Sequence, residues 1–122
     1  MRWVIRDVLA VGLLLALAGA VEARDYFGAL SYSRTTRAHG YANDQPTRED
    51  AEAAAITACS DLATDCEAVM WFGNACGALA VGPDGWGSHW DVSQQGAEKK
   101  ALDACKEYSK DCVVVRWVCT TR

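Results

Sequence analysis

Two segments of the chain carry alanine at helical spacing on one face and mostly polar residues elsewhere. In the first segment the alanines begin at Ala51 and follow Thr47, and in the second they begin at Ala97 and follow Ser93. Thr and Ser are preferred N-caps, because the side-chain oxygen accepts a hydrogen bond from a backbone N–H of the first turn. The pattern therefore predicts two helices whose narrow, alanine-rich faces can lie close to a sheet but bury little apolar area.

Segments typical of β-strands flank both predicted helices. A short segment with glycine and alanine precedes each helix, at 26–33 and 76–82, and is followed by a turn region. An alternating apolar segment follows each helix, at 66–72 and 112–119. The order strand, turn, strand, helix, strand predicts an α+β domain. We expect its strands to merge into one sheet with both helices outside.

The second set of segments is a copy of the first. The sequence FGALS at 27–31 recurs 49 positions later as CGALA at 76–80, and the matched positions of the later segments lie 46 apart. The second copy has therefore lost three residues. Repeated units usually bury their apolar faces against each other. We predict one small domain made of two repeats, about 26–74 and 75–122.

The first 23 residues have the layout of a secretory signal peptide. A basic start precedes an apolar run at 8–18, and small-residue sites that end at Ala20 and Ala23 follow. The run is too short for a membrane-spanning helix, which needs about 20 apolar residues. We predict that residues 1–23 are removed after Ala20 or Ala23. The domain 24–122 then has no stable membrane anchor.

Six cysteines in so short a chain favour disulfides formed in an oxidising compartment. Six cysteines allow 15 pairings, but two pairs have the same spacing in the two copies and two cysteines remain. Their spacing matches neither a zinc site nor a C-x-x-C redox motif. We therefore predict the bonds Cys59–Cys66, Cys105–Cys112 and Cys76–Cys119.

Charge and motifs argue against several functional classes. The chain has 12 basic and 16 acidic residues and a net charge of −4, so it lacks the cationic field of a nucleic-acid-binding protein. Its only histidines, His39 and His89, fall in the predicted turn regions, and there is no G-x-S-x-G or H-E-x-x-H motif. We expect a protein that is not an enzyme and that uses no metal and no cofactor.

The aromatic residues indicate a contact surface in the turn region of the second copy. Trp86 lies between two glycines, Trp90 follows His89, and Tyr41 matches Trp90 by position. A turn has little core to bury an indole, so Trp86 either folds back over the sheet edge or contacts a partner. The predicted surface consists of Trp86, His89, Trp90 and Tyr41, with Asp84 and Asp91 at its rim.

Two further tryptophans, Trp71 and Trp117, occupy matched positions in the closing strands. Because these strands alternate, we expect one face to be buried, and we place both tryptophans in the core.

The opening YFGALSYS at 26–33, the alanine-rich helix ending at Cys59, the cysteine at 66 and the restart NACGALA at 74–80 resemble a family of exported bacterial proteins. These small proteins are known only as a domain of unknown function. The resemblance covers residues 25–119. It implies a secreted or periplasmic protein and supplies no catalytic residues.

Together these observations predict an exported, non-catalytic binding module whose partner is a protein in the cell envelope or outside the cell. The sharpest hypothesis is an inhibitor or immunity protein for a secreted or periplasmic enzyme, since an acidic domain complements a basic enzyme. A small secreted effector and a glycan-binding module with exposed tryptophans are the alternatives, and a hydrolase is the least favoured.

Overall fold

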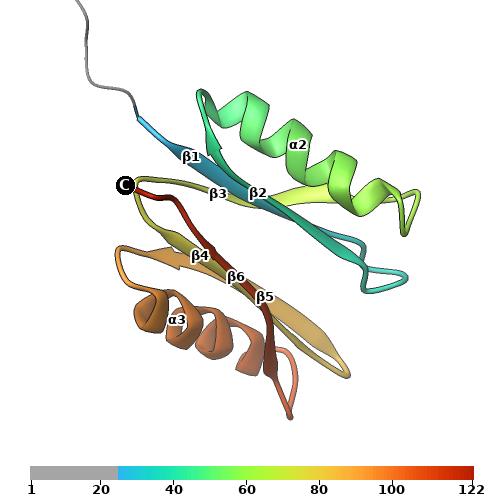
Figure 1. Cartoon of the computed structure of the whole chain (residues 1–122). Helices are drawn as coiled ribbons and strands as arrows, with labels where there is room; N and C mark the ends of the chain where they lie inside the picture. The colour runs from blue at the N-terminus through green and yellow to red at the C-terminus, as the bar shows by residue number, and fades with distance from the viewer. Residues whose placement is uncertain (1–24) are drawn as a thin grey trace, which may run out of the picture.

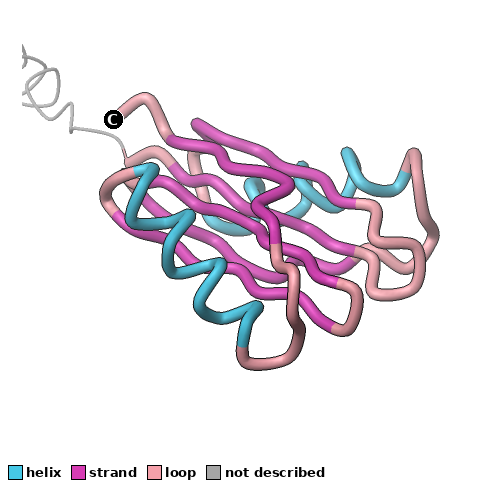
Figure 2. Tube along the Cα trace, turned by 90° about the horizontal axis from the view of Figure 1, so that it is seen from below, coloured by secondary structure: helices cyan, strands magenta, loops and turns pink. Residues whose placement is uncertain are grey.

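The computed structural model describes residues 25–122 as two three-stranded antiparallel sheets packed face to face, each with a helix on its outer side (Figures 1 and 2). The elements are β1 (Phe27–Tyr32), β2 (His39–Gln45), α2 (Arg48–Ser60), β3 (Glu67–Gly73), β4 (Cys76–Gly82), β5 (Gly85–Asp91), α3 (Gln94–Lys106) and β6 (Val113–Cys119). The α+β class and the repeated unit are confirmed. The predicted signal peptide lies outside the described residues.

Each copy forms a sheet of its own, so the prediction of one merged sheet was wrong. The strand orders are β2-β1-β3 and β5-β4-β6, with the first strand of each copy at the centre. Across the sandwich β1 contacts β4, β2 contacts β6, and β3 contacts β5. The inner faces carry the largest buried side chains, including Leu30, Phe72 and Leu79. Face-to-face packing removes both apolar faces from water, whereas joining the sheets edge to edge would leave them exposed.

The two helices lie close to their sheets, as their alanine-rich faces predict. Ala55 and Ala101 are fully buried against the sheets. On the facing strands, a Cβ added at Gly40 or Gly87 would collide with helix backbone. The N-caps are confirmed: Thr47 Oγ1 accepts from the backbone N–H of Asp50, and the Ser93 hydroxyl accepts from that of Gly96, both at 3.0 Å.

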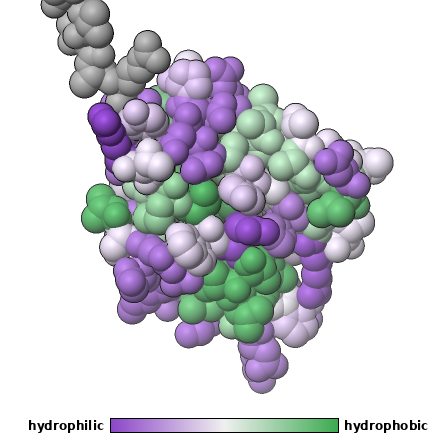
Figure 3. Space-filling model, viewed as in Figure 1, coloured by the Kyte–Doolittle hydropathy of each residue, from purple (hydrophilic) through white to green (hydrophobic). Residues whose placement is uncertain are grey.

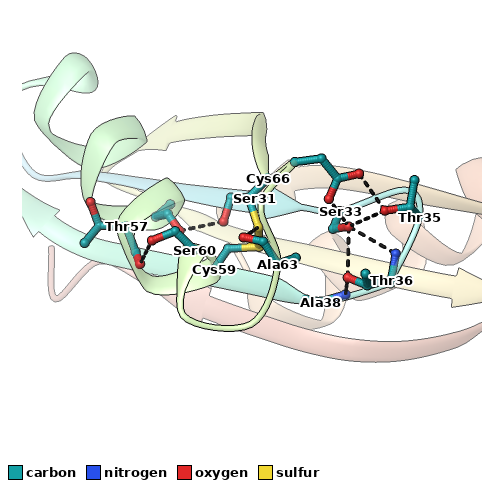
Figure 4. Close-up of a disulfide and its surroundings, with 12 residues drawn as sticks. Ser31, Ser33, Thr35, Thr36, Ala38, Thr57, Cys59, Ser60, Ala63 and Cys66 are labelled. Carbon is teal, nitrogen blue, oxygen red and sulfur yellow. Dashed lines mark hydrogen bonds between the residues drawn. A yellow bond between two sulfur atoms is a disulfide. The ribbon is translucent and has the colours of Figure 1, made fainter.

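All three predicted disulfides are present, and residues 25–122 contain no free cysteine. Cys59–Cys66, shown in Figure 4, and Cys105–Cys112 each join the end of a helix to the start of the next strand. Cys76–Cys119 joins directly paired residues of β4 and β6. The third bond has no counterpart in the first copy.

The strand registers locate the three residues that the second copy lacks. The first hairpin pairs Tyr32 with His39, whereas the second pairs Val81 with Trp86, which shortens the turn by two residues. The third is the extra residue of a β-bulge in β2, between the pairs Phe27–Gln45 and Ala29–Ala42. A bulge inserts one residue into one strand of an antiparallel pair.

This register changes one sequence match. Tyr41 pairs with Leu30, and Ser88 pairs with the equivalent Leu79. Tyr41 therefore corresponds to Ser88, and the match of Tyr41 with Trp90 was wrong. A constant offset of 49 does not hold beyond the shortened hairpin.

The start of β1, the link between the copies and the end of β6 meet at one end of the molecule (Figure 1). Asn74 donates its backbone N–H to the carbonyl of Tyr26, and Thr120 donates its N–H to the carbonyl of Ala75, both at 2.9 Å. The guanidinium carbon of Arg122 lies 5.8 Å from the ring centroid of Tyr26. None of the helices described within 25–122 is long and apolar enough to cross a membrane.

Candidate functional site

The predicted turn region of the second copy is mostly strand. Only Pro83 and Asp84 separate β4 from β5, and the aromatic residues placed in the turn lie on β5. Side chains of a strand alternate between its faces. Gly87 faces α3, so Trp86 and Trp90 lie on the opposite face of the strand from His89 and Asp91. His39, also expected in a turn, begins β2.

Trp86 covers the open end of the core between the sheets. It is half-buried, packs against the inter-sheet cluster and lies 5.3 Å from Tyr32 between ring centroids. The guanidinium of Arg34 lies over the Trp86 ring, 5.5 Å from its centroid. A hollow of about 480 Å³ opens beside these residues, with Asp84 and Tyr108 in its wall. The indole is thus engaged within the chain, which leaves it poorly suited to stacking on a sugar.

Trp90 is different, because it is 47% exposed and borders an apolar groove between the edge strands β3 and β5. The groove has a volume of about 600 Å³. Its remaining lining comes entirely from β3: Val69, Met70, Trp71, Phe72 and Gly73. Sequence reasoning found Trp90 but missed β3, because the contact of β3 with β5 depends on how the two sheets stack.

His89 and Asp91 form hydrogen bonds with their own strand and with residues of α3 and its N-cap. His89 is exposed, and its Nδ1 accepts the backbone N–H of Trp90 at 3.0 Å. The Asp91 carboxylate accepts from Lys100 Nζ at 2.7 Å and from the backbone and hydroxyl of Ser93. These hydrogen bonds, that of Lys100 first, lower the pKa of Asp91 to about 2. Asp91 therefore anchors the start of α3, and its carboxylate is already paired.

Tyr41 lies at the opposite edge of the sandwich from Trp90, because β2 contacts β6 whereas β5 contacts β3. The guanidinium of Arg116, from β6, lies 4.8 Å from the centroid of the Tyr41 ring. Burial and the nearby charge of Arg116 lower the pKa of His39, which is on the same strand as Tyr41. The predicted surface is thus divided between two edges, and it does not bring the two histidines together.

The outer face of β6 is a second exposed apolar surface. Val115 and Trp117 are 38% and 47% exposed there, and an apolar patch lies over the lower part of β6 in Figure 3. Val113 is also exposed, but it lies beyond a β-bulge and pairs with Val81 of the inter-sheet cluster, so it is on the inner face of the strand. α3 lies mainly over β4 and β5, so it leaves this face open. The prediction of a core position for Trp117 was therefore wrong. The alternation of β6 indicated two faces, but it revealed neither the β-bulge that moves Val113 to the inner face nor which face the helix covers.

Trp71, 40% exposed, is not a core residue either. Phe27 lies 6.2 Å from it between ring centroids, and the guanidinium of Arg48 lies over its ring. Part of its ring is thus covered by residues of its own copy. Trp117 has no such cover among the described residues.

Within the described part of the chain, no group of three or more His, Cys, Asp or Glu side chains is arranged to hold a metal ion. The features that stand out are the Trp90 groove and the outer face of β6. Both are apolar surfaces on rigid strands, and such surfaces are suited to binding a partner.

Comparisons with known proteins place the chain in a family. The NMR structure of Rv1813c from Mycobacterium tuberculosis is similar, with a TM-score of 0.60 and 23% sequence identity over 81% of this chain and 78% of that one. At this identity the similarity shows a shared fold. The comparison with curated proteins found no significant match. A family model described as "Domain of unknown function (DUF4189)" matches residues 27–119, and the chain belongs to that family.

Proposed function

We propose that this protein is an exported, non-catalytic module that binds a secreted or periplasmic enzyme, as an inhibitor or immunity protein. The observation that carries the proposal is the apolar groove between β3 and β5, with the half-exposed indole of Trp90 at its border. Tryptophan is among the residues that most often dominate binding energy at protein interfaces. Met70 and Phe72 give the groove an apolar wall to receive a side chain of the partner.

The disulfides support export. Three bonds in a domain of this size are typical of proteins that fold in an oxidising compartment. The predicted signal peptide at 1–23 supplies a route to that compartment.

The groove is held by strands, which favours binding without much loss of conformational freedom. Trp90 pairs with Gly77, next to the Cys76–Cys119 bond, and Met70 pairs with Leu30 at the centre of the other sheet. A preorganised surface loses less entropy on binding than a flexible loop. The net charge of −4 would also speed the encounter with a basic enzyme.

The experiment begins with cross-linking of the oxidised protein to proteins of the cell envelope and culture medium, followed by purification of each cross-linked protein. Titration of that protein should then show binding to the wild type and about 30-fold weaker binding to Trp90→Ala, which corresponds to about 2 kcal/mol for an aromatic anchor. Tyr108→Ala is the matched control, because Tyr108 is an exposed aromatic residue outside the groove. If the partner is an enzyme, its activity should fall as the complex forms.

Equal affinity of Trp90→Ala and the wild type, with both variants folded, would contradict the groove as the contact surface. Binding without inhibition would favour the alternative of a secreted effector.

A further inference from the structure

The first copy contains a complete binding site for one of its own arginines. The guanidinium carbon of Arg48 lies 4.7 Å from the centroid of the Trp71 ring, and Arg48 Nε donates to Glu52 Oε1 at 2.9 Å. Arg48 and Glu52 are one turn apart at the start of α2, and Trp71 is on β3, which α2 contacts. The indole offers its ring face to the cation, and the carboxylate holds the guanidinium in place.

The second copy retains two of these three residues. Glu98 and Trp117 follow Glu52 and Trp71 by 46 positions, whereas Gln94 occupies the position of Arg48. The Gln94 side chain is neutral, so it provides no cation for the ring or the carboxylate. Within residues 25–122, Glu98 forms no ion pair.

Space for a guanidinium is present beside these two residues. Glu98 and Trp117 border a hollow of about 440 Å³ on the outer side of β6. The side chain of Arg116, the nearest arginine in sequence, is directed away, because its guanidinium lies over Tyr41 on the other sheet. The half-buried Val114 and the exposed Val115 also line this hollow.

We propose that Trp117 and Glu98 form a receptor site for an arginine side chain of a partner protein. The guanidinium would lie over the Trp117 ring and donate to the Glu98 carboxylate, as Arg48 does in the first copy. Apolar residues beside that arginine would cover Val114 and Val115. A planar guanidinium combines stacking with directed hydrogen bonds, so the site selects arginine over lysine. It lies on the opposite edge of the sandwich from the Trp90 groove and does not depend on the function proposed above.

The test is a titration of the oxidised domain 24–122 with N-acetylarginine amide, in which NMR monitors the indole N–H signals of its four tryptophans. We expect a saturable shift of the Trp117 signal. An exposed cation–π contact combined with a surface ion pair corresponds to a Kd of about 30–300 mM. N-acetyllysine amide should bind more weakly, and Glu98→Gln should weaken binding of the arginine probe several-fold.

Two variants should fill the empty site of the second copy and empty the filled site of the first. Gln94→Arg should complete the second site from within and abolish the Trp117 response, whereas Arg48→Gln should open the first site and add a response at Trp71. Arg48 is exposed and Gln94 is half-buried, both in the first turn of a helix, so both variants should fold, and melting curves check this. Trp90→Ala should leave probe binding unchanged, which separates this site from the Trp90 groove.

Three results would overturn the proposal. The first is no response of Trp117 to the probe, and the second is a response that persists unchanged in Gln94→Arg. The third is a Trp117 signal that shifts with protein concentration when no probe is present, because the occupant would then be a second copy of this chain.

Discussion

The two copies share their strand order, helix caps and two disulfides, but they fill equivalent spaces with different side chains. Where the first hairpin meets the loop after α2, the first copy uses Ser33, whose buried hydroxyl donates to Asp65 at 2.5 Å (Figure 4). The second copy has Gly82 at that position and fills the space from the other side with Ser109. The Ser109 hydroxyl accepts the backbone N–H of Asp84 at 3.0 Å.

At other positions, too, the two copies fill an equivalent space with different side chains. Phe27 packs against Gly73 in the first copy, and the equivalent residues of the second copy are the bonded Cys76 and Cys119. On the inner face, Met70 of β3 corresponds to Arg116 of β6. The backbone of the unit thus tolerates exchanges of neighbouring side chains as long as each space is filled once. Where an exchange leaves a space unfilled or a charge without a partner, the surfaces of the two copies differ.

The largest difference in stability should come from the disulfides. Replacing Cys76 and Cys119 by Ala should destabilise the fold by about 4 kcal/mol, and replacing Cys59 and Cys66 by about 2.5 kcal/mol, because the longer loop gains more entropy when it is released. Denaturant titrations of the two double variants measure both values. A larger loss for the shorter loop would contradict the ordering by loop length.

The exchange of serine and glycine should be measurable as a coupling free energy between positions 82 and 109. Gly82→Ser should destabilise the protein by about 1–3 kcal/mol, because the new Cβ collides with the Ser109 side chain and with the backbone carbonyl of Lys110, and only the first collision is relieved by changing Ser109. Adding Ser109→Ala recreates the arrangement of the first copy and should recover about 1 kcal/mol or more. A double-mutant cycle in urea gives the coupling directly. Additive losses would mean that the two serines do not fill the same space.

The two matched tryptophans should differ in their contribution to stability. Trp71→Ala removes contacts with Phe27 and Arg48, each worth about 0.5–1 kcal/mol, whereas Trp117 has no such contact. We therefore expect Trp71→Ala to destabilise the isolated protein by about 1–2 kcal/mol more than Trp117→Ala. Thermal melts of the two variants test this, and equal losses would remove the contrast between a covered and an open site.

The smallest effect should be a pH dependence confined to the edge formed by β2 and β6. The pKa of His39 is lowered below its ordinary value of 6.5 by burial and then by Arg116, so the unfolded chain binds a proton more readily than the folded one. Stability should be complete above about pH 6.5 and should decrease as the pH falls from there towards the pKa of folded His39. His39→Gln should flatten this dependence, and Arg116→Met should weaken it.

His89→Gln is the matched control for this measurement, because His89 is exposed on the second copy. Melts between pH 7.5 and 5.5 that flatten equally for both histidine variants would contradict the role of the buried edge.

The features of the fold that depend on local sequence were predictable. The N-caps Thr47 and Ser93, the alanine-rich helices and the duplicated cysteine pairs each depend on residues close together in the chain. The third bond followed once the repeat was recognised.

Features that depend on the packing of one layer against another were not predictable. Alternation in β6 separates Trp117 from Val118, but which of them is covered depends on where α3 crosses the sheet. The separation of Tyr41 from Trp90 likewise depends on the stacking of two sheets, about which a single sequence carries no local signal. For the candidate sites, the sequence therefore identified the aromatic residue type and Trp90, but it did not identify the β3 wall or the open face of β6.

The meeting of the two chain ends with the link between the copies has a consequence for the order of synthesis. Because residues 25, 74 and 122 lie at the same end of the sandwich, a short linker from 122 back to 25 and a new start at Ala75 would reverse the order of the copies. Such a circular permutant opens the bond between Asn74 and Ala75. It retains every strand pairing and every disulfide, because each of them joins two residues of the same copy. The architecture is thus indifferent to which half is synthesised first, and each half encounters the other at the high effective concentration that a tether of two residues imposes.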